Sequence, residues 1–142
     1  GNVYFELEGA EAGTEPIGSR VIEVPAHGQE RFEMRDGHAG YIAYVPVGAI
    51  KKGEALAKEL HCSVCHGANL EGLGPVPTLA GRSPSYMARQ LFDFQTGARH
   101  GLWSDLMKPV VAKMTNDDLV NITAYMASML IRSTSSGKVW SR

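Results

Sequence analysis

The stretch HCSVCHG, residues 61–67, constrains this chain more than any other, because it holds both cysteines and a histidine directly behind the second one. Two thiols at this spacing can form a redox disulfide or supply half of a zinc site. They can also make two thioether bonds to the vinyl groups of one haem. Haem attachment uses every residue of the motif, since His66 would then lie beneath the iron as its proximal ligand.

Zinc and disulfide chemistry are the alternatives, and the surroundings of the motif favour neither. A structural zinc site usually needs four Cys or His ligands in two close pairs, and the other histidines form no second pair at ligand spacing. A thioredoxin-like cysteine would begin a helix after a strand, whereas here a predicted helix precedes the motif and a glycine-rich loop follows. A structural disulfide this short would close a tiny loop and stabilise little. Haem attachment through Cys62 and Cys65 is therefore the favoured interpretation.

Composition limits the remaining classes. With 142 residues, 44% hydrophobic and 20% charged, the chain has the balance of one modest globular domain with an extension. No apolar run approaches the roughly 20 residues that span a bilayer, and no secretory signal peptide is recognisable. The formal charge of −1 and the scattered basic residues argue against nucleic-acid binding.

The first 45 residues differ in pattern from the rest. Residues 1–18 are rich in Gly, Glu and Ala and predict a flexible lead-in. Within residues 19–45, RVIEV and YIAYV combine β-branched and aromatic residues between Pro and Gly breakers, which is typical of short strands. We therefore expect a small β-rich extension or linker before the main domain.

Helical spacing begins near Gly48. A first helix is predicted to end just before the cysteines, from small and apolar residues at three- and four-residue steps: Ile50, Gly53, Leu56, Ala57 and Leu60.

Two further helices carry recognisable ends. Ser83 is a candidate N-cap with Pro84 at the first helical position, and Gly97 would end that helix. Thr115 is the N-cap of the last helix, and acidic residues occupy its first turn. The Gly- and Pro-rich loops between helices are long for a small domain and need something to wrap around.

This order of elements resembles a class I c-type cytochrome. The parts that carry the resemblance are a helix, CSVCHG, a Gly/Pro loop, VPTLAG, a helix, a Met-bearing loop and MTNDDLVNITAYMASM. The stretch GPVPTLAGRSPSYMARQLFDFQTGAR is most similar to the haem domains of bacterial diheme cytochromes c. The resemblance covers about residues 46–133. Residues 1–45 are similar to the segment connecting two haem domains, so we expect one half of a longer protein.

The resemblance implies an all-α class I cytochrome c fold, with three to five helices around one covalently bound haem and the β-rich extension in front. Residues 134–142 would form a flexible tail. Gly53 and Tyr125 are similar to the small and aromatic residues at which the first and last helices of the family cross.

Met107 is the expected sixth iron ligand among the six methionines. Met114 lies directly before the cap Thr115 and can pack against Leu119 as a hydrophobic staple, so it already has a structural role. Met107 lies in the loop SDLMKPVV, where the family also places its axial methionine. Met114 and His100 are the alternatives. The others precede the haem domain or lie on predicted buried helical stripes: Met34, Met87, Met126 and Met129.

The pocket around the haem follows from the same resemblance. PTLAG is similar to the family's proline-containing turn, which makes the Pro77 carbonyl the expected acceptor for the ring N–H of His66. Leu79 and Tyr86 would wall the haem. Three donors could meet a propionate, with solvated surface as the alternative for both arginines: Arg82, Arg99 and Trp103.

A haem iron with both axial positions filled by protein can only gain and lose an electron. The expected function is therefore one-electron transport between redox protein partners in a bacterial respiratory chain, and not catalysis. The family's haem is attached outside the cytoplasm, which implies the periplasm. Two alternatives are a haem domain or subunit of a larger oxidoreductase complex, in which residues 20–45 would dock, and a haem sensor or peroxide-reducing centre with an open iron.

Overall fold

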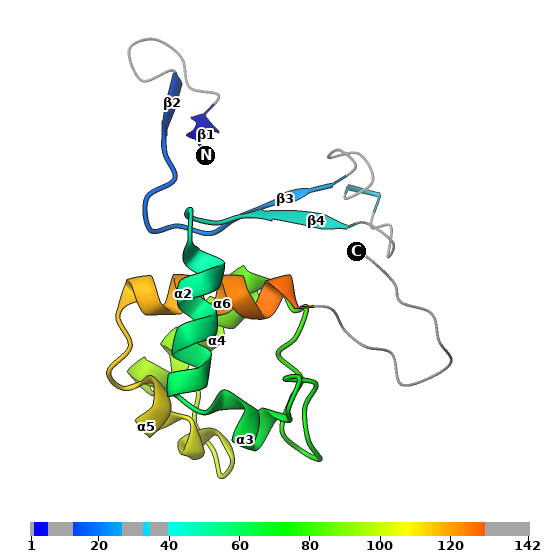
Figure 1. Ribbon diagram of the computed structural model, residues 1–142, viewed down its shortest axis with the longest axis vertical. Coiled ribbons are helices and arrows are strands. Elements are labelled where there is room, and N and C mark those ends of the chain that lie inside the picture. Colours follow the sequence, from blue (N-terminus) through cyan, green and yellow to red (C-terminus); the bar gives the residue numbers. More distant parts are fainter. Residues whose placement is uncertain (1, 6–12, 27–32, 35–39, 130–142) are drawn as a thin grey trace.

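The computed structural model describes residues 2–5, 13–26, 33–34 and 40–129, so the expected tail at 134–142 lies outside the described residues. The described helices of the main domain are α2 (Ala49–Glu59), α3 (Cys62–His66), α4 (Pro84–Thr96), η2 (Ser104–Leu106), α5 (Lys108–Val111) and α6 (Asn116–Ser128). In Figure 1 α2 crosses in front of α6, while α3 and α5 lie at the opposite end of the domain from the strands. The expected all-α domain is confirmed.

Gly53 is the point at which α2 and α6 cross. A Cβ atom built on Gly53 would lie 1.9 Å from the carbonyl oxygen of Asn121 and 2.8 Å from the Cβ of Tyr125. The two helices therefore touch backbone to backbone, and no larger residue fits between them. The expected crossing at Gly53 and Tyr125 is confirmed.

The caps expected for α4 and α6 are present. The hydroxyl of Ser83 accepts a hydrogen bond from the Tyr86 amide at 3.1 Å, and α4 ends at Gly97, whose φ of 77° suits glycine. At the start of α6, Thr115 and Asp118 form a capping box, in which each side chain accepts from the other residue's amide. Both caps satisfy N–H groups that would otherwise lack a partner at a helix start.

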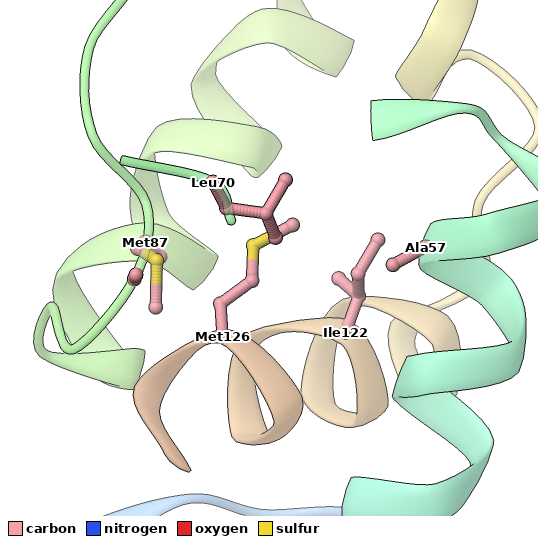
Figure 2. Close-up of a cluster of buried hydrophobic side chains, with 6 residues drawn as sticks. Ala57, Leu70, Met87, Ile122 and Met126 are labelled. Atoms are coloured by element: carbon pink, nitrogen blue, oxygen red, sulfur yellow. The ribbon is translucent and has the colours of Figure 1, made fainter. Parts of the chain in front are cut away.

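The hydrophobic core lies where α2, α4, α6 and the loop after α3 meet. Its buried members are Ala57, Leu70, Ala80, Met87, Ile122 and Met126. Figure 2 shows the Met126 side chain beside Leu70, with Ile122 pointing toward Ala57 on α2. Met87 and Met126 are each 4% exposed, which confirms the buried helical stripes expected for them.

Among the described residues before the helical domain there are four short strands: β1 (Asn2–Phe5), β2 (Gly13–Pro16), β3 (Ile22–Pro25) and β4 (Tyr41–Tyr44). β3 pairs with β4 in an antiparallel sheet, as RVIEV and YIAYV predict. β1 and β2 form a second antiparallel pair, in a range for which the sequence predicts only a flexible lead-in. The β-rich extension is confirmed, with one strand pair more than expected.

One carboxylate joins the extension to the helical domain. Oε2 of Glu23 on β3 accepts hydrogen bonds from the Ser83 hydroxyl at 2.7 Å and from the Ser85 amide at 3.1 Å. This carboxylate therefore lies at the N-terminus of α4, where the helix dipole favours negative charge.

Every helix in the described part of the chain is too short or too polar to cross a membrane.

Candidate haem-binding site

All three motif side chains of the site come from α3, a helix of five residues. Cys62 is half-buried, Cys65 is exposed, and both thiols are free. Burial raises the pKa of the Cys62 thiol. Because residues three apart on a helix lie on one face, both sulfur atoms can reach the same edge of a flat molecule.

The ring of His66 is held by a main-chain carbonyl. Its Nδ1 lies 2.8 Å from the Pro77 carbonyl oxygen, and the residue is 6% exposed. A carbonyl can only accept, so Nδ1 carries the proton and the lone pair of Nε2 is available to a metal. The hydrogen bond that the sequence predicts between His66 and Pro77 is present.

The loop between α3 and α4 is cross-linked by its own backbone. The Leu70 carbonyl accepts hydrogen bonds from the amides of Leu79 at 2.8 Å and Ala80 at 3.0 Å, and from the Thr78 hydroxyl at 3.3 Å. Leu70 itself is buried, with a φ of 55° that few residues other than glycine adopt. These hydrogen bonds fix the loop in the conformation that brings the Pro77 carbonyl next to the His66 ring.

The two candidate methionines differ in what they contact. Met114 is half-buried and packs against the core cluster, and its carbonyl accepts from the Gln95 side-chain amide at 2.8 Å. Met107 is half-buried too, between η2 and α5, yet it is not among the described residues that pack against this cluster. His100, the other distal alternative, is exposed.

The remaining predicted pocket residues occupy different settings. Leu79 packs against the core cluster, whereas Tyr86 and Trp103 are 47% and 63% exposed. Nε of Arg82 donates to the Thr78 carbonyl at 2.9 Å.

Arg99 is engaged by α4. Its guanidinium carbon lies 4.7 Å from the centre of the Phe94 ring, and Nη1 donates to the side-chain oxygen of Gln90 at 2.5 Å. A guanidinium has five N–H donors, so Arg82 and Arg99 both keep the capacity to bond another acceptor.

The structure favours neither alternative to haem. The two thiols are not bonded to each other, and among the described residues no group of three or more His, Cys, Asp or Glu side chains is placed to hold a metal ion. The donor set does fit a haem, because two thiols on one helix face adjoin an imidazole whose second nitrogen is already bonded to a carbonyl.

Sequence reasoning missed two residues of this site, Leu70 and Gly72. Neither belongs to the motif, and a buried leucine with positive φ leaves no signal in the sequence. Gly72 lies in a glycine-rich loop, and only the structure distinguishes it from its neighbour Gly74.

The family model for cytochrome c matches residues 50–130, which is more than half of the chain. The chain belongs to the cytochrome c family. Covalently bound haem c and electron transfer follow from this membership. The matched domain is therefore an electron-transfer domain, and the extension lies before the matched segment.

Curated relatives support the resemblance to diheme cytochromes. Cytochrome c4 from Azotobacter vinelandii is 37% identical over 48% of this chain and 34% of its own length. Cytochrome c4 from Thiocapsa roseopersicina is 34% identical over 66% of this chain and 45% of its own length. The chain thus spans less than half of these two relatives. It spans 82% of cytochrome c-554(548) from Halomonas halodenitrificans, with 34% identity.

Solved structures agree with the fold. Reduced cytochrome c4 from Pseudomonas stutzeri is 31% identical, with a TM-score of 0.54 over 61% of this chain and 50% of that chain. Thiosulfate dehydrogenase from Marichromatium purpuratum is 32% identical, with a TM-score of 0.55 over 70% of this chain and 23% of that chain.

Proposed function

We propose that this cytochrome c chain carries one electron at a time on a single haem, bound through Cys62 and Cys65 and ligated by His66 and Met107. The observation that carries the proposal is the hydrogen bond between His66 Nδ1 and the Pro77 carbonyl, because it leaves Nε2 as the nitrogen that could bind iron. The haem, when bound, supplies a one-electron ferric/ferrous couple. The chain anchors it, supplies both axial ligands and leaves no open position for substrate.

The choice of Met107 rests on what the other candidate already does. Met114 packs against the core and its carbonyl receives a hydrogen bond from Gln95, so moving its sulfur to a metal would open the core. Met107 lies outside that packing, on a short segment that ends at the proline-containing helix α5. A thioether is a soft ligand that favours ferrous iron and raises the potential relative to two histidines.

The partners of this carrier are expected to be oxidoreductases. Among the relatives are a thiosulfate dehydrogenase electron acceptor from Stutzerimonas stutzeri and the cytochrome subunit of sulfide dehydrogenase from Chlorobaculum tepidum. Because the family's haem is attached outside the cytoplasm, we expect this carrier in the periplasm or another compartment outside the cytoplasm.

A second candidate is a haem domain or subunit within a larger oxidoreductase. The match to thiosulfate dehydrogenase covers 70% of this chain but 23% of that one, which favours this arrangement. Copurification from the native source separates the two: a free carrier elutes alone, and a subunit elutes with its catalytic partner.

The axial ligands are tested by the weak far-red absorption band that a thioether bound to ferric iron produces. We expect the unmodified protein to show this band and Met107→Ala to lose it. The variant should also bind carbon monoxide in the ferrous state and have a lower midpoint potential, since the choice of axial ligands moves haem potentials over a range of about 0.8 V.

Met114→Leu is the matched control, because it conserves apolar volume. It should keep the band at a cost of under about 1.5 kcal/mol in stability. If Met114→Leu loses the band and Met107→Ala keeps it, Met114 is the iron ligand and Met107 is not. Absence of the band in the unmodified protein would make His100 the leading distal ligand.

A further inference from the structure

Gly72 lies directly behind the carbonyl that holds His66. A Cβ atom built on Gly72 would lie 2.8 Å from the Val76 carbonyl oxygen, 2.9 Å from the Thr78 amide nitrogen and 3.1 Å from the Pro77 carbonyl carbon. All three atoms are backbone, so they cannot move aside as the end of a flexible side chain would. The backbone of residues 76–78 therefore occupies the space that a side chain at position 72 would need.

Gly72 is also hydrogen-bonded to the backbone of His66. Its amide donates to the His66 carbonyl at 2.8 Å, and the Pro77 carbonyl that it supports accepts from the His66 ring. The His66 backbone is therefore hydrogen-bonded to Gly72, Gly72 lies against the backbone of Pro77, and the Pro77 carbonyl is hydrogen-bonded to the His66 ring. The position of the ring acceptor relative to His66 thus depends on how closely residues 72 and 77 approach.

The remainder of the loop limits how the backbone could yield to a side chain at position 72. Leu73 and Val76 exchange backbone hydrogen bonds of 3.1 and 3.0 Å on one side of Pro77. On the other side, the Leu79 amide and the Thr78 hydroxyl are bonded to Leu70. With both flanks held, an added methyl group would displace the peptide between them, which carries the Pro77 carbonyl.

We propose that Gly72 is a positioning residue for the proximal ligand: its lack of a side chain sets the Nδ1–H···O bond of His66 and so the donor strength of Nε2. The inference rests on the proposed role of His66. A histidine that donates a strong hydrogen bond from Nδ1 is the more basic ligand. It favours ferric iron, the more highly charged state, so weakening the bond should raise the midpoint potential.

The test compares Gly72→Ala with variants at two glycines that share its positive φ but not its contacts. Gly72 has a φ of 91°, whereas Gly74 in the same loop has 57° and Gly48 has 82°; a Cβ on either control meets nothing within 4 Å. The two control variants therefore carry the strain of positive φ without the contact.

Two measurements on the haem-loaded protein report the strength of the hydrogen bond between His66 Nδ1 and the Pro77 carbonyl. In Gly72→Ala the Nδ1 proton of His66 should exchange with solvent about tenfold faster by NMR, equivalent to a bond weaker by about 1.4 kcal/mol. The midpoint potential should rise in a redox titration. Gly74→Ala and Gly48→Ala should change neither. No change in Gly72→Ala, or equal changes in all three variants, would refute the positioning role.

Gly67→Ala provides a second test in case the Gly72→Ala variant does not fold. A Cβ on Gly67 would lie 3.1 Å from the Gly72 carbonyl oxygen, a milder contact that pushes on Gly72 and, through it, on the Pro77 peptide. It should move both readouts in the same direction by a smaller amount, and unchanged values would again refute the role. The unmodified protein tests His66 separately: if its ring protons show no haem ring-current shift, the ligand assignment fails whatever the glycine variants do.

Discussion

The helical domain and the N-terminal extension are held together in different ways. In the domain, α2 and α6 touch through Gly53 with no room for a methyl group, and six buried residues form one cluster. In the described part of the extension, the strands form two two-stranded sheets. On β4, Tyr41, Ile42 and Tyr44 are 45–53% exposed. The domain is specified by close packing, whereas the described strands of the extension are paired by backbone hydrogen bonds and leave the large side chains of β4 about half exposed.

This difference predicts a one-way dependence. Isolated two-stranded sheets are marginally stable in water, so the extension needs the domain. The domain has its own core, so we expect it to need little from the extension beyond the Glu23 carboxylate at the start of α4. The predictions below test that asymmetry, in order of decreasing effect.

The largest effect is expected within the domain, at the attachment site. Replacing both Cys62 and Cys65 with alanine removes both thioethers, so acidified acetone should extract all of the haem. Either single variant should keep one thioether and retain its haem under the same extraction. Extraction of haem from the unmodified protein would contradict covalent attachment.

The next largest effect is expected at the helix crossing. Gly53→Ala places a methyl group 1.9 Å from the Asn121 carbonyl oxygen, so α2 and α6 must separate. We expect a loss of about 3 kcal/mol or more in the free energy of unfolding, measured by denaturant titration. Lys51→Ala, at an exposed position on the same helix, should change it by less than about 0.5 kcal/mol. Equal stability of both variants would mean that the crossing is not tight.

A smaller effect is expected where the extension meets the domain. Glu23→Ala removes the acceptor for the Ser83 hydroxyl and the Ser85 amide, while Ser83 still caps the Tyr86 amide. We expect a loss of about 1 kcal/mol, with faster hydrogen exchange at the Ser85 amide. Glu71→Ala, an exposed carboxylate on the loop after α3, is the control. A loss as large as that of Gly53→Ala would make the extension part of the domain core.

The smallest effect is expected from removing residues 1–18. This deletes β1 and β2, which pair with each other, and leaves the β3–β4 sheet and Glu23 in place. The absorption spectrum and haem content should be unchanged, with a stability change within about 0.5 kcal/mol. Loss of bound haem in this truncated protein would contradict the proposal that the domain does not depend on the first strand pair.

The sequence by itself determined the features that act over a few residues. The spacing of Cys62, Cys65 and His66, with no second Cys/His pair at ligand spacing elsewhere in the sequence, favours haem chemistry over zinc. The caps Ser83 and Thr115 mark helix starts because their side chains accept hydrogen bonds from amides three positions further along the chain.

Only the tertiary structure decided which segments touch. One spacing rule cannot distinguish Gly72 from Gly74, since both lie in the same loop at positive φ, yet one meets three backbone atoms and the other none. Likewise the pairing of β1 with β2 is not encoded by composition, which predicted a flexible segment. Contacts between distant segments depend on how closely whole elements pack, and a local pattern carries no record of that distance.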